Sequence, residues 1–512
     1  MANICCTTTE AHTSPRWVDF CCSLSVSALR KWKGTPINTL TNSVRAELHL
    51  FNILHGRIKF YLPPYGKVRD ENAKRIYRAT ILSKLDYGSA IYGSARNSVL
   101  KKLDTIHHSA LRLCSGAFRT SPTSSLYVDC YEPPLEIRRQ MLSLHYYLRI
   151  SSNTRHPCHG FQLRPFLHRL QQARPSSVPT FFTRMHNLMK YFNLHEVPIS
   201  LQPSFLPPWK DSEFKYLNPF GSFDKSNTSD TIFQQLFADH RLRFHDFVPI
   251  YTDGSKLSSR VSFAVVFPKS VSAFTLLPFC SIFTAEITAV FHALKQILKC
   301  PIGKYAIYTD SLSVLQVLNS LHCKSHPLVF SVLDLYEKLI SQGFSLVFCW
   351  VPSHVGIAGN EQADSNARSA THFSHEPVPV CDLKKHIKSC LQMKWQIHWD
   401  QELNNKLRSI KPIIENWSED VNRKRSTILT RLRIGHTRFT HRHLLLGEPA
   451  PTCPHCSCTM SVKHILIECK HFKIHRLRFF NTSSPTLTTM IGRHPHIYLF
   501  EFLKITGFYP HI

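Results

Sequence analysis

Four acidic residues between positions 248 and 370 stand where their side chains could act together. Asp253 and Asp310 follow short apolar, β-rich runs and precede small residues. Glu286 opens a helical pattern, and Asp364 lies in a second helical pattern after a loop. The chain is otherwise poor in acids, with 34 Asp and Glu against 62 Lys and Arg, so these carboxylates need an explanation. Carboxylate oxygens are the ligands that Mg²⁺ prefers, and the four acids therefore predict a site for divalent metal ions.

The chemistry that such a site would perform is hydrolysis of a phosphodiester. A phosphodiester is an anion that resists attack by water, and two metal ions can activate the water and stabilise the departing 3′ oxygen together. We expect two Mg²⁺ ions, with Mn²⁺ as an alternative. His354, on a loop before the last helical pattern, could assist proton transfer or product release because its reference pKa lies near neutral pH.

Each of these residues also has a purely structural explanation. Asp253 could begin a turn, and Asp310 could cap the helix that follows it. Glu286 could complement a helix dipole, and His354 could be an ordinary loop histidine. Any one explanation suffices for its own residue. Together they require four separate coincidences in the right order, so we favour the metal site.

The hydrophobic pattern around the acids predicts an α/β domain over residues 248–372. The expected strands cover residues 248–253, 261–267, 271–277, 305–309 and 345–350. The expected helices cover residues 284–299, 312–318, 327–341 and 360–370. Three successive strands followed by βαβ-type alternation indicate a mixed five-stranded sheet with flanking helices. Asp253 and Asp310 would lie at neighbouring strand ends, where ligands gather in such sheets.

The strings that contain these acids resemble a known family. They are Thr252-Asp253-Gly254-Ser255, Ala285-Glu286, Thr309-Asp310-Ser311, Ser353-His354-Val355-Gly356-Ile357, Gly359-Asn360-Glu361 and Ala363-Asp364. They resemble the motifs of type 1 ribonuclease H, most of all the version carried by non-LTR retrotransposons. The resemblance implies endonucleolytic cleavage of the RNA strand of an RNA–DNA hybrid. It also implies that the four acids are the metal ligands.

The resemblance extends to the substrate. It implies that Gly254, Ser255 and Asn360 lie near the RNA strand, where a 2′-hydroxyl distinguishes RNA from DNA. Some family members carry a basic insertion that grips the hybrid. Here Lys324 and Lys338 are the only lysines or arginines between Asp310 and His354, so we expect the insertion to be absent and the grip to come from elsewhere.

Composition indicates the class of partner. The chain has 512 residues, enough for two to four domains, and a formal net charge of +28 at pH 7. Such a surplus predicts a polyanionic partner, nucleic acid first, and we expect no membrane partner. The 17 cysteines show no disulfide framework, and neither a leader nor a membrane-spanning run is apparent. We therefore expect an intracellular protein, in the nucleus or the cytoplasm; the sequence does not determine its oligomeric state.

The segment before this domain divides into two parts. Residues 20–150 are predicted to be helical, with one helix between Asn97 and Gly116 and another beginning at Pro134. Strings such as Leu85-Asp86-Tyr87-Gly88 and Gly116-Ala117-Phe118-Arg119-Thr120-Ser121-Pro122 resemble the region downstream of the polymerase palm in non-LTR retrotransposon reverse transcriptases. The chain contains no adjacent Asp pair, so we expect a remnant in a truncated retroelement protein, without polymerase activity. Frequent prolines predict an irregular linker over residues 151–247.

The C-terminal part is basic and aromatic. Residues 380–447 are predicted to be helical, and their cations, in runs such as Arg423-Lys424-Arg425, could neutralise phosphates. Trp395, Trp399 and Trp417 could stack on unpaired bases, or equally well form the core of these helices.

Residues 450–475 contain a set of metal-ligand residue types. Cys453, Cys456, His464 and Cys469 have the spacing C-x2-C-x7-H-x4-C, which suits a closed tetrahedral structural Zn²⁺ site. The competing ligands nearby are His455, Cys458 and His471. The spacing also resembles the CCHC element of reverse transcriptases from the same retrotransposon group. Its role would be nucleic-acid binding or structural closure.

Three functional hypotheses follow. The first is a metal-dependent ribonuclease H in a truncated retroelement protein. The second is a non-catalytic protein that binds nucleic acid through the basic and CCHC regions. The third keeps the fold but changes the substrate to double-stranded DNA, as in transposases and integrases, and the Gly359-Asn360-Glu361 context argues against it.

Overall fold

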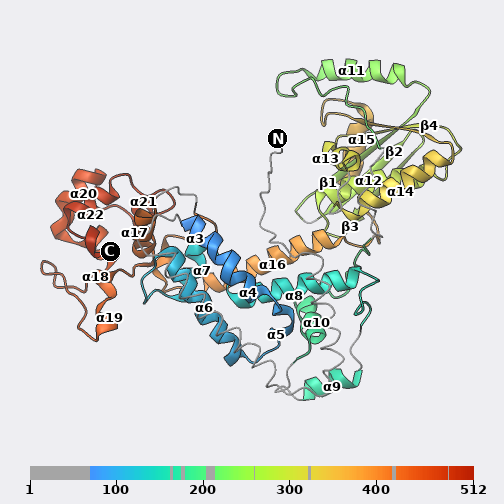
Figure 1. Ribbon diagram of the computed structural model, residues 1–512. Helices are drawn as coiled ribbons and strands as arrows, with labels where there is room; N and C mark the ends of the chain where they lie inside the picture. The colour runs from blue at the N-terminus through green and yellow to red at the C-terminus, as the bar shows by residue number, and fades with distance from the viewer. Residues whose placement is uncertain are drawn as a thin grey trace, which may run out of the picture. The chain divides into compact units, whose positions relative to one another are not determined.

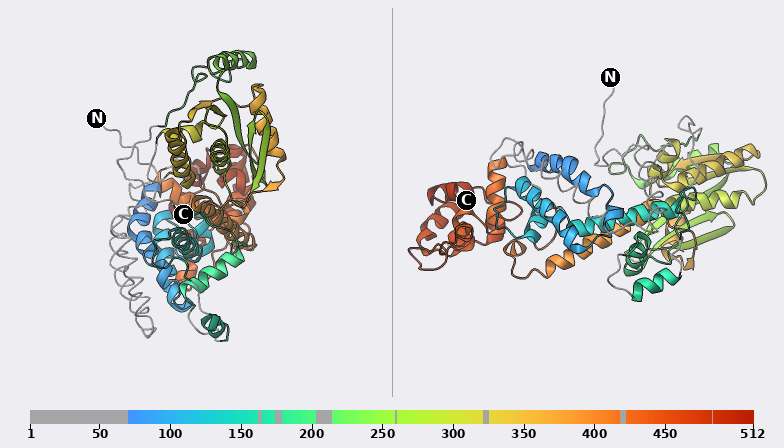
Figure 2. Two further views of the ribbon diagram at one scale, coloured as in Figure 1. Left: turned by 90° about the vertical axis from the view of Figure 1, so that its right-hand side faces the viewer. Right: turned by 60° about the horizontal axis from the view of Figure 1, so that its bottom comes forward.

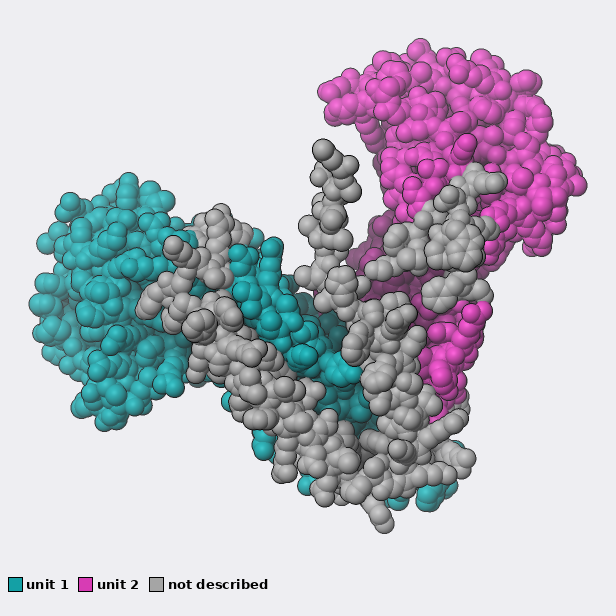
Figure 3. All heavy atoms as spheres, in the orientation of Figure 1, with its two compact units in different colours: residues 1–144, 163–188, 389–512 teal, residues 145–162, 189–388 magenta. Residues whose placement is uncertain are grey.

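The computed structural model describes residues 70–161, 165–173, 179–202, 214–258, 260–320, 325–417, 422–482 and 484–512. The prediction for residues 20–150 therefore lies partly outside the described residues. The chain divides into two compact units (Figure 3). Unit 1 takes the described residues of 1–144, 163–188 and 389–512, and unit 2 those of 145–162 and 189–388. No helix of the described part is long and apolar enough to cross a membrane.

Unit 2 is built on a six-stranded mixed sheet in the order β5-β4-β1-β2-β3-β6. Strands β1 to β4 are labelled in Figure 1. Its strands are β1 (Val248–Lys256), β2 (Val261–Phe267), β3 (Ser270–Leu276), β4 (Lys304–Thr309), β5 (Ser345–Trp350) and β6 (His372–Phe373). β1 runs antiparallel to β2 and parallel to β4. The predicted mixed α/β fold is confirmed, but the prediction of five strands was wrong. β6 consists of only two residues paired with β3, too few to show a periodic pattern.

Helices cover both faces of this sheet (Figures 1 and 2). They are α11 (Asp230–Arg243), α12 (Ile282–Ile297), α13 (Leu312–Asn319), α14 (Pro327–Ser341) and α15 (Ala358–Ser369). Side chains alternate between faces along a strand, so Gly254 of β1 faces α12 whereas Tyr251 faces α15. Ser281 starts α12, because its hydroxyl accepts the Thr284 backbone N–H.

Residues 214–247, within the stretch predicted as a linker, pack onto this domain. Leu217 pairs with Cys349 of β5 and adds a bridge to that edge of the sheet. Phe220 and Phe233 are buried in one hydrophobic cluster with Tyr308 and Val355. α11 therefore covers the same face as α15 and is part of the core of unit 2.

Unit 1 and the connecting segments are helical. The longer helices are α3 (Asp70–Tyr77), α6 (Asn97–Ser115), α7 (Thr123–Cys130), α8 (Leu135–Ser152), α9 (Pro165–Ala173), α10 (Phe181–Tyr191), α16 (Val380–Asp400), α17 (Arg423–Ile434) and α20 (Lys473–Phe480). The shorter ones are α4 (Ser83–Asp86), α5 (Ser89–Tyr92), α18 (Arg438–His441), α19 (His443–Leu446), α21 (Leu487–Ile491) and α22 (Leu499–Ile505). α6 ends at Ser115 and Gly116 follows it directly, as predicted; Gly116 has the left-handed conformation.

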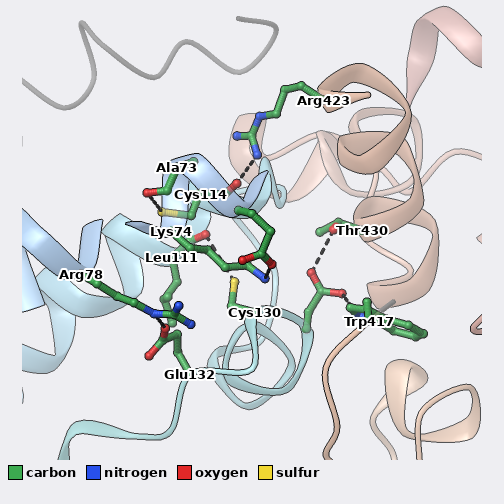
Figure 4. Close-up of polar contacts among 12 residues, drawn as sticks. Ala73, Lys74, Arg78, Leu111, Cys114, Cys130, Glu132, Trp417, Arg423 and Thr430 are labelled. Carbon is green, nitrogen blue, oxygen red and sulfur yellow. Dashed lines mark hydrogen bonds and ion pairs between the residues drawn. The ribbon is translucent and has the colours of Figure 1, made fainter. Parts of the chain in front are cut away.

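The basic residues of α17 correct one expectation. Arg423 and Arg433 are buried, and their guanidinium groups donate to backbone carbonyls, including that of Cys114 (Figure 4). Trp395 and Trp399 are buried as well, which confirms the core alternative for these two residues. Desolvated and bonded in this way, these arginines and tryptophans are not free to contact phosphates or bases.

Buried polar contacts also join distant parts of unit 1. Asp129 accepts from the indole of Trp417 at 3.1 Å and from the hydroxyl of Thr430 at 2.9 Å (Figure 4). Lys411 donates to the carbonyl of Val128 at 3.0 Å. Residues near position 129 and residues of 389–434 therefore share one interior, because a buried polar group must find its partner within the fold.

Candidate functional site

Three of the four predicted acids meet at one edge of the sheet. Asp310 directly follows β4, and Asp253 lies beside it because Thr252 and Thr309 are paired in the parallel ladder. Glu286 comes from the second turn of α12. One carboxylate oxygen of each of Asp253, Glu286 and Asp310 lies within 4.8 Å of the others. β1 extends to Lys256, beyond the predicted end at Asp253, because residues 254–256 pair with β2.

Burial and mutual repulsion perturb these acids. Burial, followed by the charges of Asp310 and Asp364, raises the pKa of Asp253 to about 8. Burial, followed by the charges of Asp253 and Asp310, raises the pKa of Glu286 well above its ordinary value. Burial also raises the pKa of Asp310, against the opposing effect of a hydrogen bond from Asn360. Carboxyl groups gathered in this way resist ionisation unless a cation joins them.

The buried oxygens of the cluster are suited to metal ions. Asp253 Oδ2 and Glu286 Oε2 are buried and have no hydrogen-bond partner among the described residues. Oxygens of this kind are costly to bury unless something coordinates them. An all-carboxylate donor set matches hard divalent cations such as Mg²⁺.

The fourth acid lies in a neighbouring group. A carboxylate oxygen of Asp364, one of Glu361 and a ring nitrogen of His354 lie within 4.8 Å of one another. His354 Nδ1 is 3.8 Å from the nearest oxygens of both acids. Asp364 is also paired with Arg368 of the same helix, at 2.9 Å. It remains close enough to Asp253 for its charge to raise the pKa of that residue.

The residues predicted to approach a substrate surround this cluster. Gly254 packs against the first turns of α12, and Ser255 follows it on β1, half-buried. Asn360 is only 1% exposed, and its Oδ1 has no partner among the described residues. Asn360 thus belongs to the interior of the site, beside Asp310.

Two further residues of the site were not predicted. Glu361 joins His354, and its carboxylate accepts the Gly356 backbone N–H at 3.3 Å. Arg368 neutralises part of the charge of Asp364. The four-residue spacing from Asp364 to Arg368 on a helix is the signal that could have identified this pair.

A second candidate metal site lies in unit 1. The ligand atoms of Cys453, Cys456, His464 and Cys469 lie within 4.8 Å of one another. The Cys469 sulfur is 3.9 Å from each of the other two sulfurs. A tight turn brings the first two cysteines together, because the Ser457 N–H donates to the Cys453 carbonyl and the Cys453 N–H to the Cys458 carbonyl.

This cluster has the chemistry of a zinc site. Burial opposes ionisation of Cys453, but hydrogen bonds from His464 and from backbone amides lower its pKa to about 6. A thiolate is the form that binds Zn²⁺, so the donor set fits this metal. Cys458 competes for a place, because its sulfur lies 3.3 Å from His464 Nδ1. His455 and His471 instead stack on each other, with ring centroids 3.8 Å apart.

Comparison with known proteins assigns one part of the chain. A family model described as RNase H matches residues 245–372. RNase H1 from the halophilic archaeon Halobacterium salinarum NRC-1 aligns at 22% identity and a TM-score of 0.20, over 24% of this chain and 96% of that chain. The N-terminal RNase H domain of a Mycobacterium tuberculosis protein, solved as a fusion with maltose-binding protein, aligns at 20% identity and a TM-score of 0.20, over 24% and 93%. No curated protein matches the chain. Residues 245–372 are therefore an RNase H domain.

Proposed function

We propose that this domain is a metal-dependent endoribonuclease that cleaves the RNA strand of RNA–DNA hybrids. The observation that carries the proposal is the meeting of Asp253, Glu286 and Asp310, with two buried oxygens that lack a partner among the described residues. Acids placed together at this cost in stability are typical of a functional site. The RNase H family match supports the choice of substrate.

The position of each residue in the site suggests its role. Asp253, Glu286 and Asp310 would hold the metal ions together with Asp364, and bound metal would supply charge neutralisation and activation of water. Asn360 would orient Asp310 through its amide. His354, with more than half of its side chain exposed, would exchange a proton with substrate or product.

A hybrid-cleavage assay tests the proposal. Full-length protein is incubated with a labelled RNA–DNA hybrid, and with the matching RNA duplex and DNA duplex, with and without Mg²⁺. We expect Mg²⁺-dependent cleavage of the hybrid RNA strand alone, abolished by Asp310→Asn. Hybrid binding without cleavage would contradict the proposal, and cutting of the DNA duplex would favour the transposase-like hypothesis.

A non-catalytic role in binding nucleic acid is the second candidate. The net charge of +28 and the Cys/His cluster of unit 1 favour it. We propose that this cluster binds a structural Zn²⁺ ion, whether or not the RNase H site is active. The burial of Arg423 and Arg433 weakens the hypothesis for α17 but leaves the exposed basic residues available.

We also propose that the chain is related to non-LTR retrotransposon proteins. The support is the set of strings resembling the post-palm region of reverse transcriptases, together with the CCHC spacing. The absence of an adjacent Asp pair from these 512 residues argues against polymerase activity within them. A primer-extension assay tests this expectation, and extension by the purified protein would contradict it.

A further inference from the structure

The loop that carries His354 has an unusual backbone. His354 has a φ of 50° and Gly356 a φ of 78°, both in the left-handed region. That region costs a non-glycine residue roughly 1–2 kcal/mol, so the conformation persists only where neighbouring groups hold it. Val355 and Ile357 attach the loop to the core of unit 2, because both are buried in the cluster that contains Phe233.

Two side chains from the segment before the RNase H domain hold this loop on either side of His354. Lys225 Nζ donates to the Ser353 carbonyl at 2.6 Å and to the Ser353 hydroxyl at 3.2 Å. Gln234 Nε2, from α11, donates to the Val355 carbonyl at 2.9 Å. The carbonyls of the residues directly before and after His354 are thus both tied to residues 214–247.

The same segment is firmly attached to the sheet. Phe233, next to Gln234, is buried, and Phe237 packs its ring 5.2 Å from that of Tyr308 on β4. Arg241 donates to the Tyr308 hydroxyl at 3.1 Å. Because α11 is attached to the sheet in this way, it can hold the loop at a fixed position relative to the sheet, whereas a flexible linker could not.

Gly356 packs closely against α11. A Cβ atom on Gly356 would lie 2.4 Å from Gln234 Nε2, so the loop and the Gln234 amide are in direct contact. On the other side of the loop, His354 Nδ1 faces Glu361 and Asp364 at 3.8 Å. The loop is therefore held between α11 and the acids of α15.

We propose that Lys225 and Gln234, two residues of the segment that precedes β1, act as positioning residues for His354 in the nuclease. This inference rests on the proposed ribonuclease function and adds to it two residues that lie before the 245–372 family match. The two side chains do not touch the acid cluster. They hold the backbone on both sides of His354, and so limit the directions in which the imidazole can point.

The test is a double-mutant cycle in the full-length protein. We expect Lys225→Ala combined with Gln234→Ala to lower kcat for hybrid cleavage roughly 5- to 20-fold, with KM unchanged, since misplacing a proton-transfer group affects the chemical or release step. In a His354→Ala background the same pair should have less than about a twofold further effect, because groups that act through one residue are non-additive. Lys225→Arg, made alone in otherwise wild-type protein, should retain most of the wild-type rate.

Matched controls separate positioning from general damage. Gln235→Ala on the same helix and Lys215→Ala in the same segment remove exposed side chains and should leave kcat unchanged. Full additivity with His354→Ala would overturn the proposal, as would an equal loss in the controls.

A second measurement does not depend on activity. Backbone amides of residues 353–357 should exchange with deuterium at least about fivefold faster in the Lys225→Ala, Gln234→Ala protein, while those of β1 and β4 stay unchanged. Unchanged exchange in the loop would overturn the positioning role. If exchange in the loop is faster in the variant but the wild-type protein cleaves no hybrid, the proposed function alone is refuted.

Discussion

Gly254 of β1 lies directly against the backbone of Glu286 in α12. A Cβ atom at position 254 would lie 2.7 Å from the Glu286 amide nitrogen and 3.0 Å from the Ala285 carbonyl carbon. Both atoms belong to the helix backbone and cannot rotate away. The absence of a side chain at Gly254 is therefore what lets the carboxylates of Asp253 and Glu286 approach each other from strand and helix.

Gly254→Ala should separate the acids without removing any of them. We expect a loss of about 1–3 kcal/mol in the free energy of unfolding, from the forced shift of α12, and a fall in Mg²⁺ affinity of at least about tenfold. Calorimetric titration of Mg²⁺ and denaturant unfolding measure the two effects. Gly303→Ala is the control, because its nearest neighbouring atom would be 3.6 Å away. Unchanged Mg²⁺ affinity in Gly254→Ala would contradict the role assigned to Gly254.

The raised pKa of Asp253 makes the metal-free domain depend on pH. The folded-state pKa is about 8 against an ordinary value of 3.8, so the folded state binds the proton more tightly than the unfolded chain. The stabilising effect of that proton is complete below about pH 4 and is lost as the pH rises towards 8.

Asp253→Asn should therefore stabilise the metal-free protein at pH 8 but not at pH 4. We expect a gain of roughly 1–3 kcal/mol at the higher pH, since one pKa unit corresponds to about 1.4 kcal/mol. Thermal unfolding in EDTA across this pH range measures the gain, with the exposed Asp334→Asn as control. Saturating Mg²⁺ should reverse the order, because the wild type then gains binding energy that the variant lacks. A variant that is less stable than the wild type at pH 8 in EDTA would contradict this account.

The sequence places Asp253, Glu286 and Asp310 on or directly beside elements that it marks clearly. Short apolar, β-rich runs mark β1 and β4, and the apolar stripe of α12 places Glu286 near its start. The contacts that hold the His354 loop could not be predicted in this way. Lys225 lies in an irregular segment, and nothing in its neighbours indicates which carbonyl, 128 positions away, it will reach.

In the basic C-terminal region, the sequence suggested phosphate-binding side chains where the structure has buried ones. Arg423 and Arg433 belong to runs that resemble a phosphate-binding surface, and α17 has no clear apolar stripe that would indicate burial. Their burial depends on carbonyls at the ends of other elements, such as Leu113 and Ile491. Tertiary partners of this kind leave no local pattern in the sequence.

Arg423 should therefore affect stability rather than nucleic-acid binding. Its guanidinium donates to the carbonyls of Leu113 and Cys114, in the last turn of α6. We expect Arg423→Ala to cost roughly 2–4 kcal/mol of unfolding free energy, because it removes two hydrogen bonds from a charged group in the interior. Lys424→Ala, an exposed neighbour, should cost less than about 0.5 kcal/mol.

A binding experiment distinguishes this role from phosphate contact. Below the unfolding temperature, Arg423→Ala should bind a hybrid with the same dependence on salt as the wild type. A phosphate-contacting arginine would instead reduce the slope of log affinity against log salt by about one. A reduced slope in the folded variant would show that Arg423 reaches the substrate.

The Cys/His cluster should link zinc content to the stability of unit 1. Cys453 and Cys469 are buried within one hydrophobic cluster together with Leu466 and Phe502, so a metal that joins them also fixes that core. We expect one Zn²⁺ per chain after purification under reducing conditions, measured by atomic absorption. Removing it with a chelator should lower the unfolding temperature of unit 1, because binding energy for the folded form is folding energy.

Single substitutions test which ligands hold the zinc. Cys469→Ser should abolish zinc binding, whereas Cys458→Ser should retain it, although the Cys458 sulfur lies 3.3 Å from His464. Cys300→Ser, in unit 2, controls for the loss of a thiol alone. Zinc lost from Cys458→Ser but kept by Cys469→Ser would reassign the site. Protein without zinc would mean that the buried thiols serve only as packing.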